Sequence, residues 1–75
     1  MPTIDMAATG LKIKEILEIK GITVKEAAKK FGFTSPYPVY KWINGKTLPA
    51  LDNLVILAKV TGTKLDDLIV VDEAA

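Results

Sequence analysis

The chain has 75 residues, 49% of which are hydrophobic, and a formal net charge of +1. It contains no cysteine and no histidine, which excludes disulfides, a thiolate or histidine zinc site and a nucleophile–histidine–acid triad, so we expect neither an enzyme nor a cofactor. This length fits one small domain over residues 1–75, with frayed ends at 1–4 and 72–75. No apolar run approaches about 18 residues and no secretory signal is present. We therefore expect a cytoplasmic protein that does not enter a membrane.

The first predicted helix begins after a cap at Asp5 and runs to about Lys20. Gly10 lowers the helix propensity of this stretch by up to about 1 kcal/mol relative to Ala, so it marks either a distortion or a helix that begins only at Thr9. The apolar residues at helical spacing predict the buried face: Leu11, Ile13, Ile16 and Leu17.

The segment 23–45 predicts a short helix, a tight turn and a second short helix. Thr23 and Glu26 have the spacing of a capping box at the start of the first of these helices. Gly32 stands where a left-handed residue ends the helix, and Phe33 is expected to turn back toward the core. Two short helices joined by a few residues that include a glycine are typical of the helix-turn-helix motif.

The second helix of this motif is expected to be capped by Thr34 or Ser35, with Pro36 as its first residue. The residues three and four apart predict its inward face: Val39, Trp42 and Ile43. The remaining side chains are expected to point outward: Tyr37, Tyr40, Lys41 and Asn44.

After a loop from which Leu48 is expected to insert into the core, a fourth helix is predicted over residues 51–61. Its expected inward face is Leu51, Leu54, Val55, Ala58 and Val60. Thr63 is expected to cap a short fifth helix whose buried residues are Leu65, Leu68 and Ile69. We interpret Asp66 and Asp67 as partners of the dipole of this helix, not as a catalytic pair.

Three runs carry a family resemblance: LKIKEILEIKGITVKEAAKKFGF, VYKWING and KTLPALDNLVILAKVTGTKLDDLI. From about Asp5 to Val70, the chain resembles the lambda-repressor-like, Cro/repressor-type helix-turn-helix family of small bacterial and phage regulators. The resemblance implies an all-α, compact five-helix bundle whose third helix enters the major groove of double-stranded DNA. Glutamines that often open the second and third helices of the family are replaced here by Val24 and Tyr37.

The resemblance implies base contacts from Ser35, Tyr37, Tyr40, Lys41 and Asn44. Phosphate contacts are expected from the backbone N–H groups of Val24 and Lys25 and from Lys46 and Thr47. Residues 1–48 hold eight lysines and four acids, whereas residues 49–75 hold two lysines and five acids, which favours a polyanionic partner for the first part. Lys29 and Lys30 are interpreted as solvated.

The sequence therefore predicts a bacterial, sequence-specific transcriptional regulator that acts as a repressor and binds DNA as a homodimer. The apolar candidates for a dimer interface, which fit the core equally well, are Val60, Ile69, Val70 and Val71. The alternative is a protein-interaction module of the same fold, such as an antitoxin-like or scaffold subunit, that binds a protein partner through Tyr37 and Tyr40.

Overall fold

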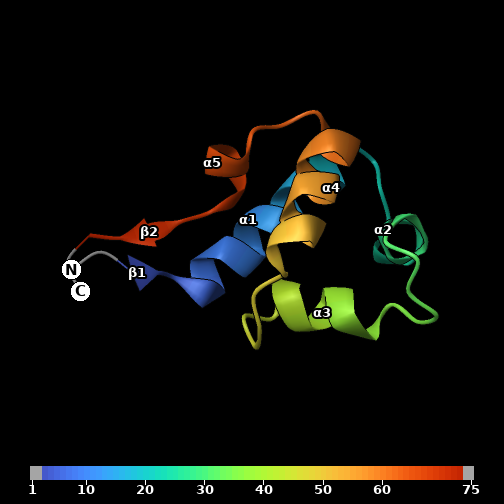
Figure 1. Cartoon of the computed structure of the whole chain (residues 1–75), viewed down its shortest axis with the longest axis horizontal. Helices are drawn as coiled ribbons and strands as arrows, with labels where there is room; N and C mark the ends of the chain where they lie inside the picture. The colour runs from blue at the N-terminus through green and yellow to red at the C-terminus, as the bar shows by residue number, and fades with distance from the viewer. Residues whose placement is uncertain (1–2, 74–75) are drawn as a thin grey trace.

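The computed structural model of the chain describes residues 3–73 (Figure 1); residues 1–2 and 74–75, which belong to the ends that we expected to be frayed, lie outside the described residues. The elements in chain order are β1 (Thr3–Ile4), α1 (Met6–Ile19), α2 (Val24–Lys30), α3 (Tyr37–Ile43), α4 (Leu51–Thr61), α5 (Leu65–Leu68) and β2 (Val71–Asp72). The expected five-helix bundle is confirmed, with a small two-stranded ribbon added to it. No helix in the described part is long and apolar enough to span a bilayer.

Helix α1 begins directly after Asp5, whose carboxylate accepts a hydrogen bond from the N–H of Ala8 at 2.9 Å. Gly10 lies inside the helix, which begins before it at Met6 and continues through it to Ile19. A Cβ atom at this position would lie 2.3 Å from the carbonyl oxygen of Trp42, so only glycine lets the backbones of α1 and α3 approach this closely. A Cβ on Gly45 would similarly lie 2.9 Å from the Cα of Ala7.

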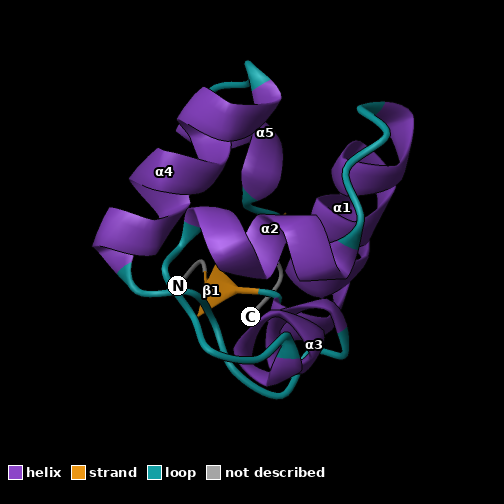
Figure 2. Cartoon of the chain, turned by 90° about the vertical axis from the view of Figure 1, so that its right-hand side faces the viewer, coloured by secondary structure: helices purple, strands orange, loops and turns teal. Residues whose placement is uncertain are grey.

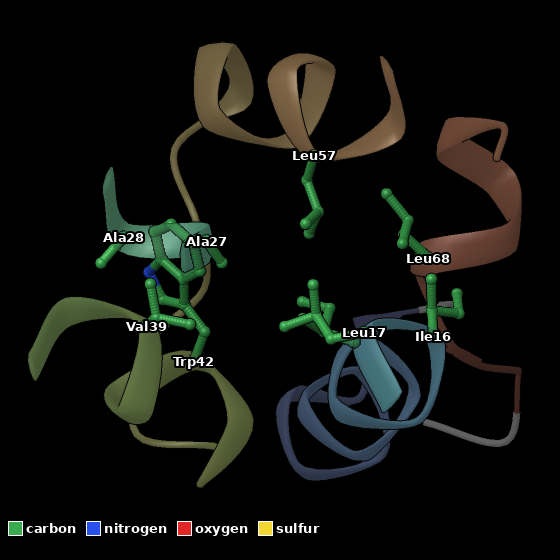
Figure 3. Packing of buried hydrophobic residues seen from close by; sticks show 9 residues of the cluster. Ile16, Leu17, Ala27, Ala28, Val39, Trp42, Leu57 and Leu68 are labelled. Atoms are coloured by element: carbon green, nitrogen blue, oxygen red, sulfur yellow. The ribbon is translucent and has the colours of Figure 1, made fainter. Parts of the chain in front are cut away.

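The core lies where the helices meet, and Figure 3 shows side chains from all five of them pointing into it. Trp42 is only 5% exposed, which confirms its expected place in the core. It packs edge-on against two rings that flank the turn of the motif: its centroid lies 5.1 Å from that of Phe31 and 5.7 Å from that of Phe33. The turn is thereby fixed to the inner face of α3.

The predicted inward face of α4 is wrong in part. Leu51 is 72% exposed and Val55 is also exposed, whereas Leu57, which we did not expect inside, is 1% exposed. The buried stripe consists of Leu54, Leu57 and Thr61. Thr61 is tolerated in the interior because its hydroxyl donates to the carbonyl of Leu57 at 2.7 Å, which satisfies the polar group. The buried face therefore differs from the one that a count of apolar residues selects.

Helix α1 shows the same kind of error, because Leu11 is exposed and Thr9 is buried. The Thr9 hydroxyl accepts a hydrogen bond from the N–H of Val70 at 3.0 Å. Leu48 is exposed as well, and the following Pro49 is buried in its place.

Two expected caps differ in the structure. Helix α3 begins at Tyr37, one residue later than expected, with Pro36 in the cap position; the Ser35 hydroxyl accepts from the N–H of Tyr37 at 3.3 Å. At α5 the cap position belongs to Lys64 and not to Thr63, because the carboxylate of Asp67 accepts from the N–H of Lys64 at 3.2 Å.

Thr3, Ile4 and Asp72 lie in the ends that we expected to be frayed, but they form the ribbon together with Val71. Strands β1 and β2 pair antiparallel, with Thr3 opposite Asp72 and Ile4 opposite Val71, and they lie side by side at one end of the molecule in Figure 1. The N–H of Asp5 donates to the carbonyl of Val70 at 2.8 Å. These hydrogen bonds hold the segment after α5 against the start of α1.

Candidate nucleic-acid interface

The outer face of α3 presents two aromatic rings and one cation. Tyr37 is 66% exposed and Tyr40 is 46% exposed, and the Lys41 ammonium stands 5.5 Å from the centroid of the Tyr37 ring. A cation at this distance is attracted by the ring face. The structure thus brings three of the predicted base-facing residues together on one exposed surface.

Backbone hydrogen bonds and a left-handed glycine end α3 at its C-terminus. Gly45 adopts a left-handed φ of 71°, and the N–H of Lys46 donates to the carbonyl of Lys41 at 2.9 Å. The N–H of Thr47 points to the same carbonyl, at 3.4 Å. These two N–H groups are therefore engaged, and Lys46 and Thr47 offer an outside ligand their exposed side chains instead. Asn44, one residue before Gly45, is exposed.

The start of α2 is held by the expected capping box. The Thr23 hydroxyl accepts from the N–H of Glu26 at 3.1 Å, and the Glu26 carboxylate accepts from the N–H of Thr23 at 3.3 Å. The Thr23 hydroxyl also lies 3.0 Å from this carboxylate. This hydroxyl contact is the main cause that lowers the pKa of Glu26 below its ordinary value of 4.5; the backbone hydrogen bond and the charges of Lys30 and Lys29 act in the same direction.

Val24 and Lys25 occupy the first two positions of α2. N–H groups in a first helical turn have no acceptor within the helix, so geometry leaves those of Val24 and Lys25 available for a partner outside it. The two side chains differ, since Val24 is half-buried against the core and Lys25 is exposed.

A hollow of about 100 Å³ connects α2 with the turn that precedes α3. Its lining is formed by Lys25, Ala28, Lys29, Phe33, Thr34, Ser35 and Pro36, and Figure 2 shows α2 lying beside α3 and the loop that joins them. The hollow brings Lys25 and Ser35, two predicted site residues from different parts of the motif, to one place. Lys29, which we interpreted as solvated, lines it as well; its position four residues after Lys25, on the same helical face, was the signal available in the sequence.

Comparison with known proteins agrees with this geometry. Residues 13–68 match the family model described as Helix-turn-helix. No curated protein matches the chain significantly. Among solved structures, the chain is similar to the crystal structure of the restriction-modification controller protein C.AhdI from Aeromonas hydrophila, with a TM-score of 0.76 and 22% sequence identity; the similarity covers 85% of this chain and 96% of that one.

The structural match shows a shared fold, and the family match shows membership, because it extends over most of the chain and includes α2, α3 and the turn between them. The chain therefore belongs to the Cro/C1-type helix-turn-helix family of DNA-binding transcriptional regulators.

Proposed function

We propose that the protein is a sequence-specific repressor of transcription that inserts α3 into the major groove of double-stranded DNA. The observation that carries this proposal is the division of α3: Trp42 anchors its inner face in the core, while Tyr37 and Tyr40 stay exposed. A helix held in this way can enter a groove without rearrangement of the fold. Ser35 precedes the helix and Asn44 follows it, so both lie close enough to its ends to meet base edges.

Phosphate contacts flank the helix on both sides in this proposal. Lys46 and Thr47 follow α3 and present exposed side chains, and the first-turn N–H groups of Val24 and Lys25 open α2. Contacts of this kind fix the register of a protein on the duplex, whereas base edges supply the sequence preference. The similar solved structure is named as a controller protein of a restriction-modification system, which supports a regulatory role.

Specific binding by so small a unit calls for two copies on adjacent half-sites, about 34–36 Å apart. We therefore propose a homodimer on DNA. Among the apolar residues that the sequence offered for the dimer contact, Val71 is exposed in β2, whereas the other three are half-buried: Val60, Ile69 and Val70. Val71 is accordingly the candidate that is free to contact a second copy.

The test is selection of binding sites from random duplex oligonucleotides, followed by titration of the enriched site with salt. We expect enrichment of a two-fold symmetric site. The logarithm of the binding constant should fall linearly with the logarithm of the salt concentration, with a slope of about −0.9 for each phosphate contacted. A symmetric site would also support the dimer. Failure of any sequence to enrich would overturn the proposal.

The same exposed tyrosines support a second candidate, a protein-interaction module that uses α3 as its contact surface. Exposed aromatic residues are enriched at protein interfaces, and Tyr37 and Tyr40 are exposed on this face. Such an interface is predominantly apolar, so its affinity should change little over the salt range that weakens DNA binding. The salt titration therefore distinguishes the two functions.

A further inference from the structure

The outward surface of α3 holds one side chain, Lys41, of a type that reads a base with two hydrogen bonds at once. Its sequence is YPVYKWI, and its inner face takes Val39 and Trp42. Arg, Lys, Asn and Gln are the usual bidentate readers of purine edges in the major groove, and of these only Lys41 occurs within the helix. Lys41 is half-buried, and its ammonium lies over the Tyr37 ring. What the helix itself offers DNA is therefore two phenol rings and the single charge of Lys41.

The chemistry of these rings selects a partner within the groove. Covering polar base edges with an aromatic ring costs free energy, because the groups lose hydrogen bonds to water. The C5-methyl group of thymine is the apolar group that the major groove exposes. A ring that packs on this methyl group buries apolar surface on both sides and leaves the phenol hydroxyl at the solvated edge.

The two rings are also placed to act together. Residues three apart in an α-helix are separated by about 4.5 Å along its axis, and successive base pairs are about 3.4 Å apart. With α3 lying along the groove, Tyr37 and Tyr40 are within reach of base pairs that are neighbours or next neighbours. The Lys41 ammonium lies 5.5 Å from the Tyr37 centroid, and this weak attraction favours a position of the ring on the same helical face.

We propose that Tyr37 and Tyr40 determine sequence preference by packing on thymine methyl groups, so that each half-site carries T·A pairs at two nearby positions. This inference rests on the proposed insertion of α3 into the major groove. It names the feature of DNA that the helix reads and assigns the reading to apolar contact instead of hydrogen bonding.

The experiment replaces thymines of the selected site by deoxyuridine, one position at a time, which removes the C5-methyl group and keeps the base pair. Loss of one buried methyl group, worth about 0.8 kcal/mol, should weaken binding about fourfold, since 1.4 kcal/mol corresponds to tenfold. We expect this loss at two nearby positions in each half-site and little change elsewhere.

Variants assign each methyl group to its ring. In Tyr37→Ala, the deoxyuridine penalty should disappear at one of the two positions, and in Tyr40→Ala at the other, because the contact is already absent. Tyr37→Phe and Tyr40→Phe should keep the penalty, since the ring remains. Ile19→Ala removes an exposed apolar side chain at the far end of α1 and serves as the matched control, with the penalties unchanged. Thermal melting verifies that each variant is folded.

The outcomes separate this inference from the proposed function. A site that is bound with sequence preference, yet tolerates deoxyuridine at every position, would overturn methyl reading while leaving the regulator proposal in place. Penalties that persist in both alanine variants would also overturn it, as would their loss in the phenylalanine variants, which would assign the contact to the hydroxyl groups. If no duplex is selected at all, both proposals fail.

Discussion

The two faces of α3 differ in burial and in packing, although they belong to the same seven residues. The inner face is fixed by close packing: Val39 is fully buried, Trp42 meets two phenylalanine rings, and the backbone passes Gly10 without room for a methyl group. The outer face makes few contacts with the rest of the chain. Stability should therefore depend on the first face and binding on the second, and substitutions can test how completely the two are separated.

The largest effect is expected from Trp42→Ala. Removal of this ring leaves a cavity between α2 and α3 and should cost about 3–5 kcal/mol of unfolding free energy, which is a large part of the stability of so small a domain. Chemical denaturation followed by circular dichroism measures the loss. Tyr40→Ala, on the opposite face, is the matched control and should unfold at nearly the same denaturant concentration as the wild type. Equal losses in the two variants would contradict the division of the helix.

A smaller loss is expected from Gly10→Ala. Alanine is the better helix former by about 1 kcal/mol, but its Cβ would lie 2.3 Å from the Trp42 carbonyl oxygen, and overpacking of this kind typically costs about 1–3 kcal/mol. We expect a net decrease in unfolding free energy, and weaker DNA binding because α3 is displaced.

Leu11→Ala is the control for this variant, since Leu11 is the next residue of α1 and is exposed; its effect should stay within about 0.5 kcal/mol. A Gly10→Ala variant more stable than the wild type would show that the two backbones are not in contact.

Gly10 also illustrates what sequence alone leaves open. Its low helix propensity was evident, but the reason for a glycine lies 32 residues further along the chain, in the carbonyl oxygen of Trp42. Local signals such as the Thr23–Glu26 capping box were predicted correctly because both partners lie within one helical turn. A close crossing of two helices depends on tertiary contacts, which no local pattern encodes.

The errors in the buried faces share one physical origin. Thr9 and Thr61 are buried, although the sequence pattern selected only apolar residues for the inward faces of their helices. Each hydroxyl finds a backbone partner, the N–H of Val70 or the carbonyl of Leu57, so the polar group costs little inside. The outward-facing residues of the candidate site were easier to predict, because the large Trp42 side chain set the orientation of the whole helix.

On the binding side, Lys46→Ala should reduce affinity for all DNA sequences by a similar factor and lower the salt slope by about one unit for each copy bound. The reason is that Lys46 offers only its side chain, its N–H being bonded to the Lys41 carbonyl. Lys59→Ala, in the last turn of α4, is the charge-matched control and should leave the slope unchanged. If both variants lower the slope equally, the effect is one of overall charge and not of a contact beside α3.

The smallest effect concerns Glu26, an exposed residue that nevertheless supports the packed part of the molecule. Because folding lowers its pKa below 4.5, the ionised carboxylate favours the folded state: this contribution is complete above pH 4.5 and is lost as the pH falls through the lower folded-state pKa. Glu26→Gln keeps an acceptor for the N–H of Thr23 but has no titration. The difference in melting temperature between wild type and variant should therefore shrink on acidification.

Thr23→Ala shows whether this pH dependence originates in the capping box. It removes the hydroxyl that is the main cause of the lowered pKa but keeps the backbone hydrogen bond and the charges of Lys30 and Lys29, so the effect of Glu26→Gln should depend less on pH in that background. The decisive comparison is made with Thr23 present, between neutral pH and about pH 3, which is below the ordinary carboxyl pKa. If the difference in melting temperature between wild type and Glu26→Gln is constant over this range, the carboxylate has no special role at the start of α2. The sequence preference of DNA binding at neutral pH should be unaffected by the glutamine substitution, because the substitution leaves the outer face of α3 intact.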